Sequence, residues 1–362
     1  MQVIIIQKSS DKKSTNKGSI IMSTNSNSIR EASQRPQWLD EQLYPFQSRF
    51  VEVEGNRIHY IDEGTGPTLF FIHPGVGWSF MYRDIIQELR SRFRCVALDL
   101  PGFGLSPAAP GYQHTLTGDS RLLERLMQAL GMIDVTLFSH DLTGSIALGV
   151  VARRLEWFRA VIVLPSFAWP LEHYRKVYPM IQLMGSPLFR FLSTYFNFFL
   201  EYMLRAVTKK PKRPFSDLEK QVYRGPNLDR AVRRYPHDLF KSVTKSHDYL
   251  ADLEQRLSEI STPILASHLA NDASASTAAQ SGEVQGSIRP AVLTRPANDA
   301  SASSYGQAGR AEKEMPALLI FGDQDATIKM GWLARLERIF PRHRTIIMKG
   351  SHHFPRFTIL LL

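Results

Sequence analysis

The sequence predicts an α/β fold with a mostly parallel central sheet, helices on both of its faces and an inserted helical cap. Two observations support this prediction. Apolar runs typical of buried strands alternate with stretches at helical spacing over residues 68–164, and the pattern resumes over residues 316–348. Between these parts, residues 171–258 contain helical stretches and no convincing strand, so we expect the cap there.

The expected elements follow in order along the chain. A hairpin is predicted where two β-rich runs, 50–53 and 57–61, flank a Glu-Gly-Asn turn. Continuous apolar runs predict buried strands at 68–72, 93–98, 135–138, 160–164, 316–321 and 345–348. Helices are expected at 81–89, 121–130, 146–152 and 331–339.

Composition predicts the domain boundaries. Residues 1–35 are rich in Ser, Asn and Lys without periodicity, which predicts a disordered tail. Residues 36–167 and 259–362 are expected to form the two parts of the α/β core, and residues 168–258 the cap. The second part is interrupted by residues 267–314, whose Ala, Ser, Gly, Asn and Gln offer little apolar surface to bury, so we expect a low-complexity loop.

The chain of 362 residues has a formal charge of +10, and most of the excess lies in the cap. Residues 168–250 carry 15 Lys and Arg against 7 Asp and Glu. A solvated basic face explains this excess, with weak contact to a membrane surface as the alternative; no motif accompanies it that would predict a nucleic-acid partner. The single cysteine, Cys95, excludes a disulfide framework and suggests no thiolate metal site, so we expect a cytoplasmic protein without a metal or another cofactor.

The most informative residue is Asp141. The strand at 135–138 runs into Ser-His-Asp-Leu-Thr-Gly, and a helix is expected directly afterwards. Small residues near Asp141 permit the sharp strand-to-helix turn that presents a nucleophile at its apex. Because a carboxylate needs no general base, Asp141 is expected to attack an electrophilic alkyl carbon and form an ester.

Two further residues complete the predicted catalytic set. Asp325 and His353 follow Asp141 in the chain order nucleophile, acid, histidine, and each comes just after a predicted strand. His353 is expected to deprotonate the water that hydrolyses the ester, and Asp325 to orient its imidazole. Asp323 and His352 are close alternatives for these two roles.

Backbone amides are expected to stabilise the ester oxygen. Leu142 provides one N–H, and Gly75 is favoured for the other because the residue before it is a proline. His73 and His140 are expected to support their loops rather than take part in the chemistry, and Asp99 to fix a turn.

In these residues the chain resembles the haloalkane dehalogenase and epoxide hydrolase branch of the α/β-hydrolase superfamily. The most specific parts are the segments 44–46, 78–80, 98–104, 140–141 and 167–170. The resemblance implies an α/β-hydrolase fold, a small apolar organic substrate and water as co-substrate. It also implies a substrate pocket that includes Trp78, Phe167 and Trp169.

Two departures from this branch affect the leaving group. Dehalogenases usually carry an Asn where Gly75 stands and a Trp where Leu142 stands, and both side chains hold the halide. Trp78 and Trp169 are the candidates to replace them. Epoxide opening instead needs an acid, often a cap tyrosine, and the tyrosines in the cap include Tyr174, Tyr178, Tyr195 and Tyr202.

Three functions therefore stay open. The first is dehalogenase-like hydrolysis through an aspartyl ester, and the second is epoxide hydrolysis. The third is a catalytically weak member retained for ligand binding or membrane association, which the missing halide donors and the short apolar sequence after His353 favour. Convergence of Asp141, Asp325 and His353 would favour an enzyme.

Overall fold

One sheet runs through the described residues, in the strand order β1-β2-β3-β5-β4-β6-β7-β8-β9. The computed structural model describes residues 5–6, 35–208, 215–271, 315–325, 330–349 and 351, and for 5–6, 206–208 and 261–271 it describes the backbone alone. The strands are β1 (Ile5–Ile6), β2 (Arg49–Val53), β3 (Asn56–Glu63), β4 (Thr68–Ile72), β5 (Arg94–Leu98), β6 (Val135–His140), β7 (Phe158–Ser166), β8 (Ala317–Gly322) and β9 (His343–Met348).

The strands from β5 to β9 are parallel, and β3 joins them antiparallel through β5. All six residues of β6 are buried, because helices cover both faces of a parallel sheet. The helices are α2 (Arg83–Leu89), α3 (Leu116–Ala129), α4 (Asp141–Arg153), α5 (Val177–Met184), α6 (Pro187–Phe196), α7 (Phe198–Thr208), α8 (Asp217–Arg224), α9 (Tyr235–Val243), α10 (His247–Asn271) and α12 (Trp332–Ile339).

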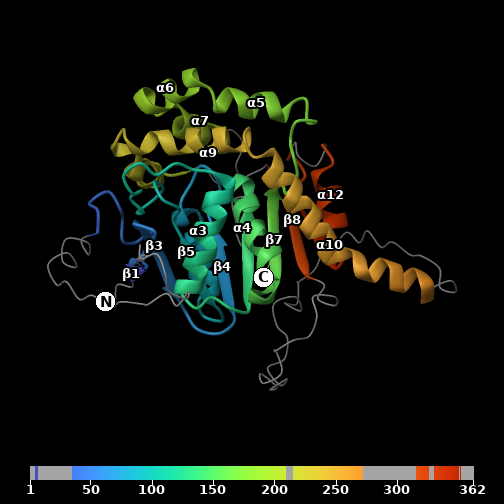
Figure 1. Cartoon of the computed structure of the whole chain (residues 1–362). Helices are drawn as coiled ribbons and strands as arrows, with labels where there is room; N and C mark the ends of the chain where they lie inside the picture. The colour runs from blue at the N-terminus through green and yellow to red at the C-terminus, as the bar shows by residue number, and fades with distance from the viewer. Residues whose placement is uncertain are drawn as a thin grey trace, which may run out of the picture.

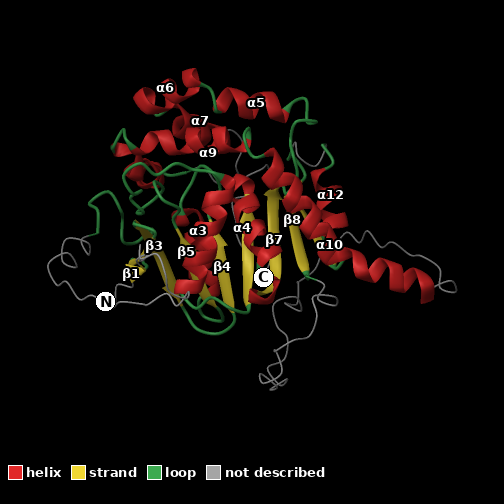
Figure 2. Ribbon diagram, in the orientation of Figure 1, coloured by secondary structure: helices red, strands yellow, loops and turns green. Residues whose placement is uncertain are grey.

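The helices divide into two groups in space (Figure 1). In that view α3 and α4 lie in front of the sheet, while α5, α6, α7 and α9 lie together above it. The arrow of β7 points toward this upper group, which we call the helical layer (Figure 2). Active sites form at the carboxyl edge of such a sheet, so the helical layer stands over the expected site.

The structure confirms the predicted α/β fold. Every predicted strand is present, with its ends shifted by at most two residues. The helix predicted from residue 121 begins five residues earlier, at Leu116. Its first turn contains Thr, Gly, Asp and Ser, which are weak helix formers, and the Thr115 hydroxyl caps it by accepting a bond of 3.0 Å from the Gly118 N–H.

Two predicted boundaries need correction. Helix α10 continues to Asn271, so it crosses the expected cap boundary at 258, and residues 267–271 of the predicted loop are helical. Ile5 and Ile6, within the predicted disordered tail, pair with Glu52 and Val53 of β2. Arg35, the last residue of the predicted tail, is ordered by hydrogen bonds from its guanidinium to the carbonyls of Leu39 and Asp40 at 2.9 and 3.0 Å. Residues 1–4 and 7–34 of the tail, and 272–314 of the predicted loop, lie outside the described residues.

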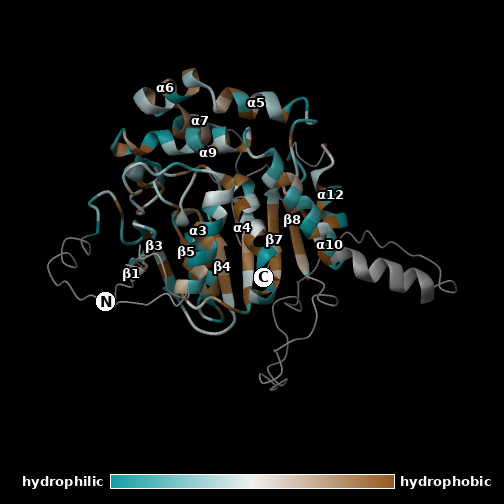
Figure 3. Ribbon diagram, viewed as in Figure 1, coloured by the Kyte–Doolittle hydropathy of each residue, from teal (hydrophilic) through white to brown (hydrophobic). Residues whose placement is uncertain are grey.

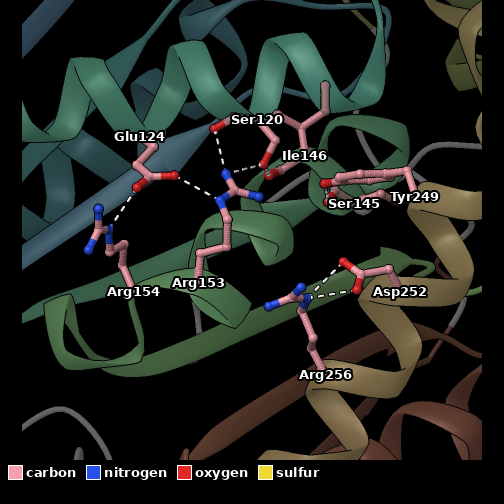
Figure 4. Close-up of polar contacts among 9 residues, drawn as sticks. All are labelled: Ser120, Glu124, Ser145, Ile146, Arg153, Arg154, Tyr249, Asp252 and Arg256. Carbon is pink, nitrogen blue, oxygen red and sulfur yellow. Dashed lines mark hydrogen bonds and ion pairs between the residues drawn. The ribbon is translucent and has the colours of Figure 1, made fainter.

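Polar contacts hold α3, α4 and α10 together (Figure 4), and one glycine of α4 permits their close approach. Arg153 of α4 binds Glu124 of α3 at 2.8 Å, and the Tyr249 hydroxyl of α10 donates to the carbonyl of Ser145 at 2.9 Å. A Cβ on Gly149 would stand 2.1 Å from the Tyr249 hydroxyl oxygen, so only glycine permits this approach. These contacts fix the body of α4, whose first residue is Asp141.

A buried carboxylate organises the loops beside the site. Asp99 accepts hydrogen bonds from the backbone of Ser79 at 2.7 Å and of Leu105 at 2.9 Å, and from the His59 ring at 2.8 Å. Burial alone would raise the pKa of Asp99, but the charge and hydrogen bond of His59 outweigh it and hold the pKa below its ordinary value. Asp99 therefore fixes its turn, as predicted.

We expect Asp99→Ala to lower the free energy of unfolding by about 3–5 kcal/mol, because it leaves buried donors without an acceptor. The stabilisation should be present above pH 3.8, the ordinary pKa, and be lost as the pH falls through the lower folded value. Urea unfolding measures both effects. Asp252→Ala is the control: its exposed pair with Arg256 should contribute less than about 1 kcal/mol, and equal losses would contradict the role of Asp99.

Candidate active site

Asp141 stands at the junction of β6 and α4 with a φ of +54°, in the left-handed region that non-glycine residues rarely adopt. Such a conformation costs about 1–3 kcal/mol and persists only where the surroundings impose it. Here the Ser166 hydroxyl, at the end of β7, donates to the carbonyl of Asp141 at 2.8 Å. The strained turn therefore presents the carboxylate at the carboxyl edge of the sheet, as the sequence predicts for a nucleophile.

The turn closes only because residue 144 has no side chain. A Cβ on Gly144 would lie 2.2 Å from the Ser166 Oγ and 2.7 Å from the Ser139 Oγ. Strand and helix backbones thus approach each other more closely than any larger residue permits. Small residues around Asp141 suggested the turn from the sequence, and the close contacts at Gly144 explain why small residues are needed there.

A backbone amide of the loop after β4 contacts the carboxylate. The Gly75 N–H donates to Asp141 Oδ2 at 3.0 Å. The Thr143 hydroxyl, in the first turn of α4, donates to the carbonyls of His73 and His140. It therefore links this loop to the strand-to-helix turn at Asp141, which we call the elbow. Leu142 follows Asp141 in the same turn of α4, where backbone N–H groups have no partner within the helix.

His73 stabilises this loop in a single protonation state. Its Nε2 accepts a hydrogen bond of 3.0 Å from the Leu100 N–H, so its Nδ1 carries the proton and donates to the Pro74 carbonyl at 2.8 Å. Burial lowers the pKa of His73, which keeps the ring neutral. Both ring nitrogens are used, so His73 acts as a support, in line with its predicted role.

The acid candidates differ in their surroundings. Asp325 lies just beyond β8 with 2% of its surface exposed, and its N–H donates to the Gly322 carbonyl at 3.0 Å. Asp323, two residues earlier, is exposed. A buried carboxylate suits the orientation of an imidazole better than a solvated one, so this contrast favours Asp325. His352 and His353 lie outside the described residues, so the structure does not test their roles.

The predicted pocket residues lie in two different places. Trp78 borders a cavity of about 30 Å³ between the core and the helical layer, and none of Asp141, Gly75 and Leu142 borders it. The rings of Phe167 and Trp169 instead pack at 5.5 and 5.9 Å from that of Trp332, at the start of α12. Within the described residues the indole N–H groups of Trp78 and Trp169 are buried without a hydrogen-bond partner.

The tyrosines expected as epoxide acids also differ in placement. Tyr195 and Tyr202 are 53% and 56% exposed, and the Tyr174 hydroxyl is 3.4 Å from the Arg335 guanidinium. A further tyrosine, Tyr82, was not singled out from the sequence. Burial and the charge of Asp141 raise its pKa, and its hydroxyl donates to the carbonyl of Ile72 at 2.7 Å.

The α/β hydrolase fold family matches residues 67–358. The chain belongs to the α/β-hydrolase family. Over 218 residues it is 34% identical to haloalkane dehalogenase 2 of Mycobacterium bovis, covering 60% of this chain and 75% of that relative. It is also 36% identical over 132 residues to the cis-3-alkyl-4-alkyloxetan-2-one decarboxylase of Shewanella oneidensis, covering 36% of this chain and 42% of that one.

A solved structure agrees with this placement. Haloalkane dehalogenase DatA from Agrobacterium tumefaciens matches with a TM-score of 0.62 over 87% of this chain and 93% of that one, and its 15% identity shows the fold alone. The chain is thus a hydrolase of the haloalkane dehalogenase-like branch.

Metal ligands do not cluster in the described residues: no group of three or more His, Cys, Asp or Glu could hold an ion there.

In this α/β-hydrolase, the Asp141 carboxylate and two leucine side chains surround Gly75. A Cβ on Gly75 would lie 3.3 Å from Asp141 Oδ2, 3.3 Å from the Leu142 Cβ and 3.4 Å from the Leu239 Cδ2. Leu239, in α9, is fully buried, and the sequence did not single it out. Residues 75 and 142 therefore offer backbone amides but no polar side chain.

Gly144→Ala should lower the free energy of unfolding by about 1–3 kcal/mol, because the new methyl group overpacks the contact with Ser166 and Ser139. Chemical denaturation measures this change. Gly77→Ala is the matched control, since its Cβ would meet only the side chains of Pro74 and Met81, at 3.3 Å and beyond. Equal stability of the Gly144→Ala variant and the parent would show that the elbow is looser than described.

Proposed function

We propose that the protein hydrolyses a small apolar organic substrate through a covalent ester on Asp141. The observation that supports this proposal is the left-handed Asp141 at the strand–helix junction, with its Oδ2 held at 3.0 Å by the Gly75 N–H. A left-handed backbone alone does not mark a nucleophile, because Asp134, just before β6, has a φ of +55° as well. At Asp141 this conformation coincides with a backbone amide that is directed at the carboxylate. The helical layer over the carboxyl edge would serve as the cap that excludes water.

The first step is displacement at carbon. A carboxylate oxygen of Asp141 attacks an alkyl carbon, the new C–O bond forms, and the bond to the leaving group breaks with its electron pair. The second step is hydrolysis of the ester. His353 takes a proton from water as the hydroxide adds to the ester carbonyl carbon. The tetrahedral intermediate then collapses, the C–O bond to the alkoxide breaks, and the imidazolium returns its proton to that oxygen to give the alcohol. The carboxylic acid left on Asp141 loses its proton to solvent, which regenerates the carboxylate.

The remaining groups have supporting roles in this proposal. The amides of Gly75 and Leu142 would stabilise the oxyanion that forms during hydrolysis, as the contact of Gly75 with Oδ2 suggests. Asp325, buried beyond β8, would orient the imidazole and stabilise its protonated form. Trp78 stays the candidate for the substrate pocket because it borders the cavity under the helical layer, whereas Phe167 and Trp169 pack against Trp332.

The leaving group separates two versions of the reaction. In the dehalogenase-like version the halide leaves with a full negative charge, yet Gly75 and Leu142 have no side-chain donor for it. A Cβ on Gly75 would also meet the Leu239 Cδ2 at 3.4 Å. In the second version the substrate is a strained oxygen ring, whose leaving oxygen stays attached to the alkylated carbon skeleton. The lack of a side-chain halide donor at residues 75 and 142 counts against the first version. The second version includes epoxides and the oxetan-2-one ring named for the Shewanella relative, and it is the second candidate because its leaving oxygen needs no halide site, although an epoxide needs an acid for that oxygen.

A substrate panel distinguishes these versions. Purified protein is incubated separately with 1-bromobutane, an aliphatic epoxide and an alkyl-substituted oxetan-2-one, and halide, diol and ring-opened or decarboxylated products are measured. Turnover of a ring with feeble halide release would support the second version. If none of the three substrates is turned over and no ester forms on Asp141, the result would favour a catalytically weak protein that binds a ligand or associates with a membrane.

His353→Gln should trap the ester on Asp141, because displacement at carbon needs no base whereas hydrolysis of the ester does. Intact-protein mass spectrometry after substrate addition would show the added mass, and peptide mapping would place it. Asp141→Asn should show no adduct. His352→Gln is the matched control and should turn over; trapping by that variant instead would transfer the role of base to His352.

Halide donors can be restored by design. Gly75→Asn with Leu142→Trp should raise halide release from 1-bromobutane, since one preorganised donor contributes about 2.7–4 kcal/mol to transition-state stabilisation in oxyanion holes. Leu239→Ala is added because its side chain would meet the new Asn. Leu239→Ala alone is the control, and rapid halide release by the parent protein would point to Trp78 or Trp169 as the halide donors.

A further inference from the structure

Large exposed hydrophobic side chains gather on the outside of the helical layer. Of the twelve that the described residues contain, eight lie on α5, α6 and α7. Figures 1 and 3 show α5 and α6 above α7 and α9, on the side of the layer away from the sheet. This concentration on three consecutive helices differs from the scattered apolar residues that any protein surface carries.

The exposed residues recur at helical spacing. Leu188, Phe191 and Tyr195 of α6 follow each other at three and four residues, so they share one face of the helix, and they are 62%, 50% and 53% exposed. The rings of Phe191 and Tyr195 lie 4.8 Å apart. Phe198 and Tyr202 of α7 stack at 6.3 Å. We call the exposed apolar side of α5, α6 and α7 the outer face.

The side chains of the outer face are different from those that pack the helical layer together. Buried residues of the same helices, including Phe189, Phe199 and Leu200, form the inner contacts. Helices α6 and α7 are therefore apolar on two sides, one turned to the protein and one to solvent. A helix that is apolar on both sides is typical of a segment with a second apolar neighbour.

Charge indicates what that neighbour is. Among the described residues between 173 and 205, every exposed charged side chain is basic: Arg175, Lys176, Arg190 and Arg205. The one acidic residue there, Glu201, is partly buried and binds Arg224 at 2.6 Å. Aromatic and leucine side chains flanked by basic residues match the interface of a bilayer that contains anionic lipid.

We propose that the outer face docks on the surface of an anionic membrane without crossing it. The described residues contain no helix long and apolar enough to span a bilayer, so the contact is interfacial. A second copy of the chain is the competing occupant. A two-fold interface would place the same patch against itself and bring basic residues of one sign together, which disfavours that occupant. The proposal does not depend on the reaction at Asp141.

Vesicle co-sedimentation tests this proposal with the full chain. We expect binding to vesicles of phosphatidylcholine mixed with phosphatidylglycerol, and weaker binding to phosphatidylcholine alone. Leu188→Ser/Phe191→Ser/Tyr195→Ser should reduce the affinity about tenfold or more, since three exposed apolar side chains that would be buried in the bilayer interface are lost. Arg175→Gln/Lys176→Gln should reduce only the preference for anionic vesicles.

Ile133→Ser/Ile347→Ser is the matched control, because these two residues are 67% and 44% exposed outside the helical layer. It should bind vesicles like the parent, and thermal unfolding shows that each variant is folded. A parent chain that binds neither kind of vesicle, or a triple variant that binds as the parent does, would overturn the proposal. A dimer in analytical ultracentrifugation that the triple variant abolishes, without vesicle binding, would assign the outer face to a second copy.

Discussion

The close approach of β6, α4 and β7 around Asp141 is the constraint on which the site depends. The chain must turn from strand to helix within one residue, which places Asp141 in a left-handed conformation, and Gly144 must pass Ser166 at a distance that excludes a Cβ. Interactions elsewhere in the fold offset the free-energy cost of this strain. Asp99 holds the neighbouring loops, and Tyr249 of α10 holds the body of α4.

The sequence predicted the features that depend on residues close together in the chain. The buried strands are continuous apolar runs, and the elbow is a local pattern of small residues around Asp141, so both could be predicted without tertiary contacts. The resemblance to dehalogenases likewise rests on short segments. The choice between Asp325 and Asp323 is different: both follow the same strand, and only their burial in the folded chain separates them.

Contacts between distant parts of the chain could not be predicted. Leu239 reaches Gly75 across more than 160 residues, and its sequence signal is that of any buried leucine. The end of α10 was misplaced because Ala and Ser composition suggested a loop, whereas the helix continues to Asn271. Tyr249 was also missed; the pairing of Gly149 with a tyrosine becomes visible only when α4 and α10 lie side by side.

The protonation state of His73 has a consequence for kinetics. Because Leu100 occupies its Nε2 and burial disfavours the charged ring, His73 takes up a proton at a lower pH than an ordinary histidine does. Protonation of Nε2 would also break the hydrogen bond from the Leu100 N–H, since a protonated nitrogen cannot accept it. In a pH–rate profile, an effect of acid through the loop that carries Gly75 would therefore lie below the pH at which an unperturbed histidine titrates.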